Sequence, residues 1–282
     1  MTMKRKLDKS IEDKLIGSRL WSNKLKEDCI EQKVFMAIRN NKIGFYHGGG
    51  LLFSFDKDGF KTHIKYASVI TLHEKDYIAE KDLSNCRIIP DFVSNYARIT
   101  ENCSLYSGIE ASSVSKIYHK NSFISDIDII VLDIEVSFGS FDEDTAKKQD
   151  RIDILLYNKT TKTLQFVEAK HFSNKEIWSD TTPKVIGQIK RYENQIDQRK
   201  NEIISEYVGY IKTINNLFNL NLPEPEKIDP KVTLLIFGFD KDQLKGRLND
   251  LIFKNSEYIG IKVYAKGEIN NLDTKTLWNT KQ

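Results

Sequence analysis

The sequence predicts an α/β fold in which helices flank a central sheet. Three observations lead to this expectation: a strand-like hairpin over residues 150–170, a long amphipathic helix over 183–218, and a strand, helix and strand in succession over 232–265. These elements are expected to form one domain over residues 100–282. Residues 1–99 are expected to form a smaller α+β domain.

The composition is that of a chain that buries a core. Of the 282 residues, 40% are hydrophobic and 29% are charged, which argues against wholesale disorder. The net charge of +3 neither requires nor excludes an anionic partner. The longest strongly apolar run, residues 232–239, is too short to span a bilayer, so no membrane partner is expected.

Cysteine and histidine spacing argues against a zinc site or a disulfide framework. Cys29, Cys86 and Cys103 are far apart and include no CxxC pair, and the five histidines include no HExxH. Free thiols in a reducing cytosol are therefore expected, and the cytoplasm is the expected compartment.

The N-terminal third is expected to begin with a frayed basic arm over residues 1–23 and a helix over 24–39, where apolar residues fall near helical spacing. The strands expected next are 42–47, 51–55 and 60–66. The triple glycine Gly48–Gly50 indicates a plain turn and not a phosphate-binding loop, because no helix start follows it.

The remaining elements follow from the same patterns. Residues 68–105 are mixed, and 109–119 are expected to form a short helix. The helix over 183–218 carries an apolar stripe at steps of three and four residues. A proline-containing loop ends it, and the elements expected after the loop are a strand over 232–239, a helix over 242–253 and a strand over 259–265.

The hairpin carries most of the chemical information. Two strand-like runs, residues 150–158 and 163–170, are separated by the polar turn KTTK. Both faces of each run carry apolar residues, which is typical of strands inside a sheet that is covered on both sides.

The length of this turn predicts the register of the hairpin. If Asn158 pairs with Thr163, Asp153 lies directly opposite Glu168, and cross-strand partners share a face of the sheet. Lys170 lies two residues beyond Glu168 and shares that face. The register thus predicts that two carboxylates and one ammonium group converge on one patch.

Two interpretations of this patch remain open on the hairpin alone. Carboxylates about 5 Å apart on neighbouring strands repel each other, and a divalent cation such as Mg²⁺ would relieve the repulsion. Alternatively, Glu168 forms a salt bridge with Lys170 while Asp153 is solvated.

The acidic residues and the lysine of this hairpin resemble the motif of a known family. Asp153, fourteen intervening residues and then Glu168-Ala169-Lys170 resemble the core motif of the PD-(D/E)XK nuclease superfamily. In that family the acidic residue and the E-x-K lie on adjacent strands of a mixed sheet. The proline that often precedes the acidic residue is replaced here by Ile152.

A second motif narrows the resemblance. Gln188-Ile-Lys-Arg-Tyr192 resembles the QxxxY motif of the RecB-like branch, at the start of the expected long helix, and a spacing of four places both side chains on one helix face. Residues 131–138 resemble the strand before the hairpin. The resemblance covers about residues 126–196.

The resemblance implies a restriction-endonuclease-like fold over residues 100–282, with an N-terminal α+β elaboration over 1–99 that selects the substrate. It also implies a nuclease that hydrolyses phosphodiester bonds in DNA, in restriction, phage defence or DNA processing. The implied cofactor is Mg²⁺, with Mn²⁺ as a substitute. The implied partners are DNA and either a separate helicase or ATPase chain or a second copy of this chain.

The resemblance further implies roles for single residues. Asp153, Glu168 and the carbonyl of Ala169 would hold the metal, and Lys170 would position or deprotonate the attacking water. Gln188 and Tyr192 would orient the lysine and the nucleic-acid backbone.

The upstream acid of the family is open between Glu110 and Glu135, and Glu135 is also a candidate metal ligand. The alternative function is a nucleic-acid-binding module with a non-catalytic nuclease fold.

Overall fold

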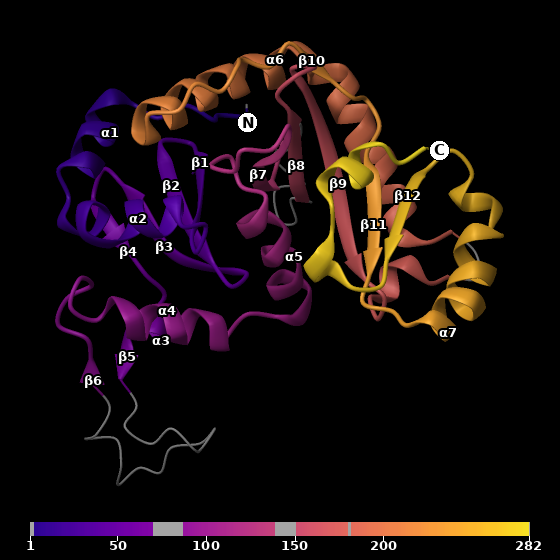
Figure 1. Ribbon diagram of the computed structural model, residues 1–282, viewed down its shortest axis with the longest axis horizontal. Helices are drawn as coiled ribbons and strands as arrows, with labels where there is room; N and C mark the ends of the chain where they lie inside the picture. Colours follow the sequence, from indigo (N-terminus) through magenta and orange to yellow (C-terminus); the bar gives the residue numbers. More distant parts are fainter. Residues whose placement is uncertain (1–2, 70–86, 139–150, 180–181, 282) are drawn as a thin grey trace, which may run out of the picture. The chain divides into compact units, whose positions relative to one another are not determined.

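The computed structural model of the chain describes residues 3–69, 87–138, 151–179 and 182–281. The chain divides into two compact units (Figure 1). The smaller unit is Leu7–Ser112, and the larger unit combines Met1–Lys6 with Ser113–Gln282. The larger unit therefore contains a short segment that precedes the smaller unit in the chain.

The smaller unit is built on an antiparallel sheet with the strand order β1-β2-β3-β4. Its strands are β1 (Phe35–Arg39), β2 (Lys42–His47), β3 (Gly50–Asp56) and β4 (Gly59–Lys61). The elements before the sheet are α1 (Lys9–Ile16), η1 (Trp21–Leu25) and α2 (Lys26–Ile30). The elements after it are α3 (Ile64–Ala67), β5 (Ser68–Val69), β6 (Arg87–Ile88) and α4 (Tyr96–Leu105).

Two expectations for the N-terminal forty residues are wrong. The described residues of the expected frayed arm over 1–23 are ordered, because residues 3–23 contain α1 and the side chains of Met3 and Arg5 are buried. The expected helix over 24–39 ends at Ile30, and the chain continues as β1.

The turn after β1 explains why a strand forms where a helix was expected. Asn40 and Asn41 have φ values of 49° and 60°, and together they form a two-residue hairpin turn that pairs Arg39 with Lys42. Asparagine tolerates this left-handed conformation better than most residues. Residues 35–38 are all buried in the sheet, whereas a helix with one apolar face would expose some of four consecutive residues.

The expectations for the next segment are largely confirmed. The strands at 42–47 and 51–55 form β2 and β3, whereas 60–66 is a strand only as far as Lys61. The glycine turn is also a plain turn. At Gly49 φ is 91°, and a Cβ atom there would lie 2.5 Å from the carbonyl carbon of Ala111, so only glycine fits.

The larger unit contains an open, mixed sheet of six strands flanked by helices, as the predicted α/β class requires. The strand order is β12-β11-β9-β8-β7, and β10 also pairs with β9. The strands are β7 (Ile129–Val136), β8 (Ile152–Asn158), β9 (Thr163–His171), β10 (Lys227–Ile228), β11 (Thr233–Phe237) and β12 (Lys262–Lys266). Strands β7, β8 and β9 are antiparallel, whereas β9, β11 and β12 are parallel.

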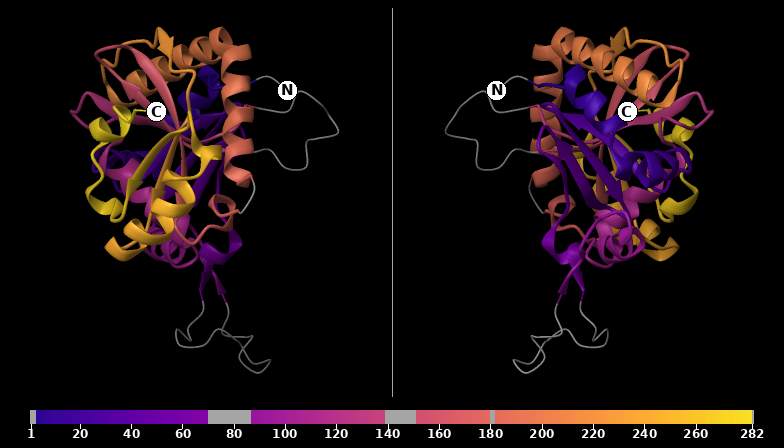
Figure 2. Two further views of the ribbon diagram at one scale, coloured as in Figure 1. Left: turned by 90° about the vertical axis from the view of Figure 1, so that its right-hand side faces the viewer. Right: turned by 90° about the vertical axis from the view of Figure 1, so that its left-hand side faces the viewer.

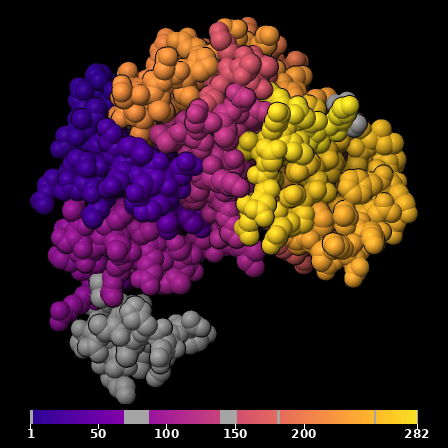
Figure 3. Space-filling model, viewed as in Figure 1, coloured from indigo at the N-terminus to yellow at the C-terminus, as the bar shows by residue number. Residues whose placement is uncertain are grey.

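Most helical elements of this unit follow β9 in the chain. They are α5 (Ile109–Lys120), which contains the boundary between the units, η4 (Lys175–Ile177), α6 (Lys184–Phe218), α7 (Lys241–Gln243), η5 (Leu244–Phe253), η6 (Ser256–Tyr258), η7 (Ile269–Asn271) and α8 (Thr274–Trp278). The expected helices at 109–119, 183–218 and 242–253 are thereby confirmed. The segment after β11, gold to yellow in Figure 3, forms a continuous part of the unit's surface.

The two faces of the sheet are covered by different helices. On one face, the ring of Phe166 contacts Phe138, whose ring in turn contacts Tyr192 on α6. Gln165, the preceding residue, points to the other face, where its amide donates to the carbonyl of Trp278 at the end of α8. Figure 2 shows the sheet between α6 and the C-terminal segment. Because side chains alternate along a strand, the even-numbered residues of β9 share the face of Phe166 and the odd-numbered residues share the face of Gln165.

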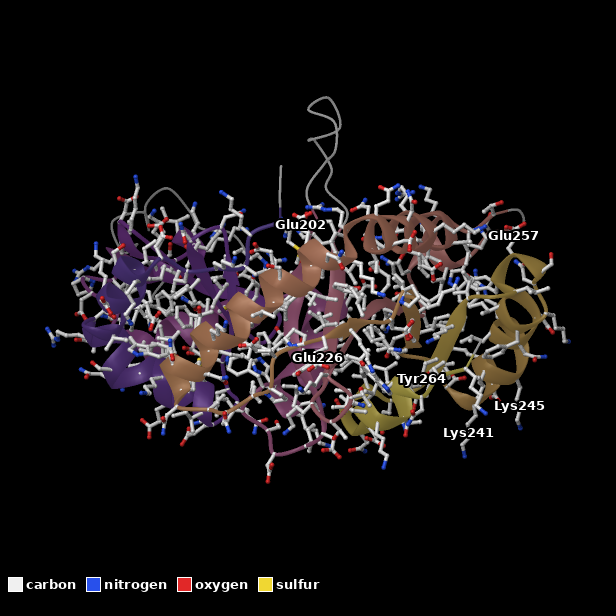
Figure 4. All side chains as sticks on the ribbon, turned by 90° about the horizontal axis from the view of Figure 1, so that it is seen from above. Glu202, Glu226, Lys241, Lys245, Glu257 and Tyr264 are labelled. Carbon is white, nitrogen blue, oxygen red and sulfur yellow. The ribbon has the colours of Figure 1, made fainter. Side chains whose placement is uncertain are left out.

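A buried ion pair joins the start of the chain to the larger unit. Arg5 Nε lies 2.9 Å from Asp133 Oδ2, and these side chains are only 4% and 0% exposed. The hydroxyl of Tyr207 on α6 donates to the same carboxylate at 2.8 Å. Nearby, the amide of Met3 donates to Glu202, which is labelled on α6 in Figure 4. These contacts bind the N-terminal segment to β7 and α6.

A kink divides α6 at Arg199, where φ is −117° and ψ is 16°. The guanidinium of Arg199 donates to both carboxylate oxygens of Glu202, at 2.9 and 2.8 Å, and to the carbonyl of Phe138. The kink therefore coincides with a side chain that binds the backbone two residues after β7.

Two of the three cysteines lie in the described residues. Cys29 and Cys103 are buried free thiols, and Cys86 lies outside the described residues. Among the helices that the structure describes, none is long and apolar enough to cross a membrane.

We expect the substitution Arg5→Met to lower the free energy of unfolding of the larger unit by about 3–5 kcal/mol, because it leaves Asp133 buried without its counter-charge. Urea unfolding followed by circular dichroism would measure the loss. The neighbouring Lys6→Met is the matched control, since the Lys6 side chain is 60% exposed and lies 3.8 Å from Glu206. The control should cost less than about 1 kcal/mol. Equal losses in the two variants would contradict a special role for the buried pair.

Candidate active site

The hairpin of β8 and β9 has the register that the sequence predicts. Asn158 pairs with Thr163, and the regular pairing continues to Ile154 and Val167. The next position in this register places Asp153 opposite Glu168. The expected hairpin is thus confirmed, and the two acidic residues lie on neighbouring strands.

The hairpin opens at Asp153. The amide of Ala169 donates to Oδ2 of Asp153 at 2.7 Å. In a regular antiparallel pair this amide would donate to a backbone carbonyl of β8. Here the side chain of Asp153 accepts the hydrogen bond instead. This hydrogen bond anchors the half-buried Asp153 side chain at the edge of the opening. Asp153 is therefore held by a backbone donor and is not fully solvated.

Glu168 and Lys170 form an ion pair on the face of β9 that α6 covers. Lys170 Nζ lies 2.9 Å from Glu168 Oε1, and the two side chains are 9% and 1% exposed. The salt bridge that the sequence left open as an alternative is therefore present. It coexists with a held Asp153, so the two interpretations of the hairpin are not exclusive.

Lys170 has a second carboxylate partner that sequence analysis missed. Glu176 Oε2 lies 3.0 Å from Lys170 Nζ, and the Glu176 side chain is 43% exposed. Glu176 belongs to the short helix η4 directly after β9. The local sequence feature that indicates this short helix is Asn174, whose side chain caps η4 by accepting from the amide of Glu176.

The charges around Asp153 raise the pKa of its carboxyl group well above the ordinary value of 3.8. Burial is the largest cause, and the negative charge of Glu168 is the next. The hydrogen bond from Ala169 and the charge of Lys170 act in the opposite direction but do not outweigh them. The pair Asp153–Glu168 thus carries a repulsion that a bound cation would remove.

The surroundings of Lys170 keep its amine protonated. Burial disfavours the charged form, but the charge of Glu168 and the hydrogen bonds to Glu168 and Glu176 outweigh it and raise the pKa of Lys170. In this arrangement Lys170 is suited to positioning a water or offsetting negative charge. Proton abstraction would need the neutral amine, which these carboxylates disfavour.

Glu135 lies next to this pair along the sheet. Ile134 pairs with Ile154 and Val136 with Ile152, so Glu135 is opposite Asp153 on the third strand. Its φ of 50° marks a local distortion of β7, and its carboxylate contacts Arg151 at 3.4 Å. Its negative charge also contributes to the raised pKa of Asp153.

The other candidate for the upstream acid is in a different part of the chain. Glu110 is in the first turn of α5 and belongs to the smaller unit, whereas Asp153 and Glu168 belong to the larger unit. Within the larger unit, Glu135 is the sequence candidate that the register brings beside Asp153.

Gln188 and Tyr192 bind each other on α6. The side-chain amide of Gln188 donates to the hydroxyl of Tyr192 at 2.8 Å. Tyr192 is buried, and its ring contacts Phe138, which contacts Phe166 two residues before Glu168. The two motif residues therefore lie over the same face of the sheet as Glu168, and Gln188 is the more exposed of the two.

The donor chemistry of the site fits a hard divalent cation. Asp153 and Glu168 provide carboxylate oxygens, and the carbonyl of Ala169 faces β8, because the amide and carbonyl of one strand residue face the same neighbour. Such oxygen donors suit Mg²⁺, which commonly keeps several waters. In the ranges that the structure describes, no group of three His, Cys, Asp or Glu side chains is placed to hold a metal.

Comparison of the chain with protein-family models, with curated proteins and with solved structures gives no match. The function is therefore inferred from the geometry of the site itself.

We expect Asp153→Asn to raise the melting temperature of the larger unit at neutral pH in EDTA. A raised pKa means that the folded protein holds this proton more readily than the unfolded chain. Asp153 therefore costs stability as the pH rises above 3.8. Asparagine removes the charge and keeps an oxygen that can accept from Ala169. Melting curves from about pH 3 to 8 should show a gain that shrinks toward acid pH.

Asp273→Ala provides a control of opposite sign in the same unit. The backbone hydrogen bond from Lys275 lowers the pKa of Asp273, so its removal should cost stability at neutral pH and less in acid. A loss of stability in Asp153→Asn at neutral pH, or a gain independent of pH, would show that charge repulsion is not the cause.

Proposed function

We propose that the larger unit is a Mg²⁺-dependent nuclease that hydrolyses phosphodiester bonds in DNA. The observation that carries this proposal is the convergence of Asp153, Glu168 and Lys170 at the open end of one hairpin. Two carboxylates and one ammonium group on adjacent strands provide the cation ligands and the positive charge that phosphodiester hydrolysis requires. The mixed sheet flanked by helices is compatible with a restriction-endonuclease-like fold.

In this proposal the cation is held by Asp153, Glu168 and the carbonyl of Ala169, with Glu135 as a further candidate beside Asp153. When bound, Mg²⁺ lowers the pKa of a coordinated water and offsets negative charge on the phosphoryl group, and Mn²⁺ would supply the same chemistry. The amide of Ala169 fixes Asp153 in this position, and the ammonium group of Lys170 fixes Glu168.

Lys170 acts as a charged donor in this mechanism. Its ammonium group carries three N–H donors, of which the structure directs one toward Glu168 and one toward Glu176. An ammonium in this position stabilises the charge that develops on the phosphoryl oxygens and orients the attacking water. The neighbouring carboxylates stabilise the protonated form of Lys170, which favours this role over that of a general base.

The first turn of α6 supports contact with a phosphate. The helix begins at Lys184, and its N-cap residue, Pro183, has no side-chain hydrogen bond to the helix. A helix N-terminus carries partial positive charge, which favours an anion. Gln188 lies one turn further along and is held by Tyr192. These residues are expected to orient the nucleic-acid backbone.

A DNA-binding module without catalysis is the second candidate. It is favoured by the small number of carboxylates that the described part of the site brings together. A gel shift without metal-dependent cleavage would select this candidate, whereas cleavage of generic DNA would select the nuclease.

We expect Glu168→Ala and Asp153→Ala each to abolish Mg²⁺-dependent cleavage while DNA binding persists or strengthens. Each substitution removes a metal ligand, and it also removes a negative charge that faces a polyanion. Cleavage of linear and circular DNA in Mg²⁺, Mn²⁺ or EDTA measures the effect. Asp250→Ala, which removes an exposed carboxylate paired with Lys254, is the control and should cut normally. Wild-type cleavage in EDTA would overturn the metal mechanism.

We expect Lys170→Ala to reduce turnover by about 10²–10³-fold, as is typical for the loss of one group that stabilises transition-state charge. DNA binding should weaken, because a positive charge is lost. Lys170→Arg should not restore turnover, since the planar guanidinium is bulkier than the ammonium group between Glu168 and Glu176. Single-turnover kinetics would measure both variants, and normal turnover in either would contradict the assigned role of Lys170.

A further inference from the structure

Lys170 is held between two carboxylates that differ in their access to solvent. Glu168, at 2.9 Å from Nζ, is 1% exposed, whereas Glu176, at 3.0 Å, is 43% exposed. A polyanion that approaches Lys170 from solvent would therefore reach the side occupied by Glu176. The inner partner, Glu168, would remain in place.

Glu176 is held in this position by the segment that carries it. Asn174 caps the turn by accepting from the amide of Glu176 at 3.0 Å. The next carbonyl, that of Ile177, accepts from the buried hydroxyl of Tyr258 at 2.9 Å. The indole of Trp178 donates to the carbonyl of Phe172 at 2.8 Å, which closes the segment on itself. The backbone of Glu176 is therefore fixed on both sides.

Charge balance does not require this second carboxylate. Glu168 alone neutralises Lys170, and Asp153 adds another acidic group whose field reaches the same ammonium. Glu176 therefore adds negative charge at a place where a nucleic acid would have to bind. A phosphodiester oxygen and a carboxylate oxygen are equivalent partners for an ammonium group, because both are anionic hydrogen-bond acceptors.

We propose that Glu176 occupies, in the free protein, the place that a phosphodiester oxygen of the nucleic acid takes on Lys170 in the complex. Binding then exchanges one anion for another on the outer side of the ammonium, and the pair with Glu168 is retained. This inference rests on the proposed nuclease function. It adds that Glu176 determines substrate affinity by competing for Lys170.

The test measures affinity without catalysis. A fluorescein-labelled DNA duplex is titrated in EDTA at several salt concentrations with the wild type, Glu176→Gln, Glu176→Asp and Asp250→Asn. Glu176→Gln should bind about two- to fivefold more tightly, the range expected for the loss of one competing ion pair of this exposure. Glu176→Asp keeps the charge but is shorter by one methylene, so it should also bind more tightly. Asp250→Asn removes a carboxylate paired with Lys254 elsewhere on the unit and should change affinity little.

A double-mutant cycle with Lys170→Met separates competition from general repulsion. If Glu176 competes for Lys170, the gain from Glu176→Gln disappears when Lys170 is methionine. A gain that persists in that background, or that Asp250→Asn reproduces, overturns the inference. Wild-type affinity in Glu176→Asp also overturns it and does not depend on folding of the Lys170 variant.

Cleavage assays distinguish failure of this inference from failure of the proposed function. A wild-type protein that cuts DNA, with Glu176→Gln unchanged in affinity, overturns the role of Glu176 alone. A wild-type protein that neither binds nor cuts DNA overturns both. Weakened Mg²⁺ binding in Glu176→Gln, with unchanged DNA affinity, would assign Glu176 to the cation and overturn the competition.

Discussion

The main electrostatic constraint on the larger unit is the placement of two carboxylates side by side on one face of its sheet. Asp153 and Glu168 are brought together by the hairpin register, and burial makes their repulsion costly. The ammonium of Lys170 and the amide of Ala169 offset this cost from two directions. Folding of this region is therefore compatible with the pair only because each carboxylate has its own donor.

The parts of the fold that sequence analysis predicted are those specified by short-range patterns. The register of β8 and β9 follows from a four-residue turn, so the spacing of residues along the chain is enough to place Asp153 opposite Glu168. The helix α6 follows from a long apolar stripe, which also placed Gln188 and Tyr192 on one face. In both cases the residues that determine the geometry lie within one element or one turn of each other.

The parts that were missed depend on contacts between distant residues or on turn chemistry. The burial of Arg5 requires Asp133 on β7 and Tyr207 on α6, and a basic N-terminal segment gives no local sign of such partners. The strand β1 was missed because the apolar residues of 24–39 fall near helical spacing, whereas the turn at Asn40 and Asn41 that pairs β1 with β2 was not recognised. Glu176 was missed because its approach to Lys170 depends on how the chain bends after β9, which periodicity does not describe.

The buried pair of Arg5 and Asp133 has a consequence for the order in which the protein is assembled on the ribosome. Arg5 is made before residues 7–112, but Tyr207, which shares the carboxylate, follows Arg5 by 202 residues. At about 5–20 residues per second, that delay is roughly 10–40 s. Residues 7–112 are complete well before then and can close their own core. The segment that carries Arg5 is thus made before the smaller unit but becomes buried only after α6 has been made, so its burial reports that α6 is in place.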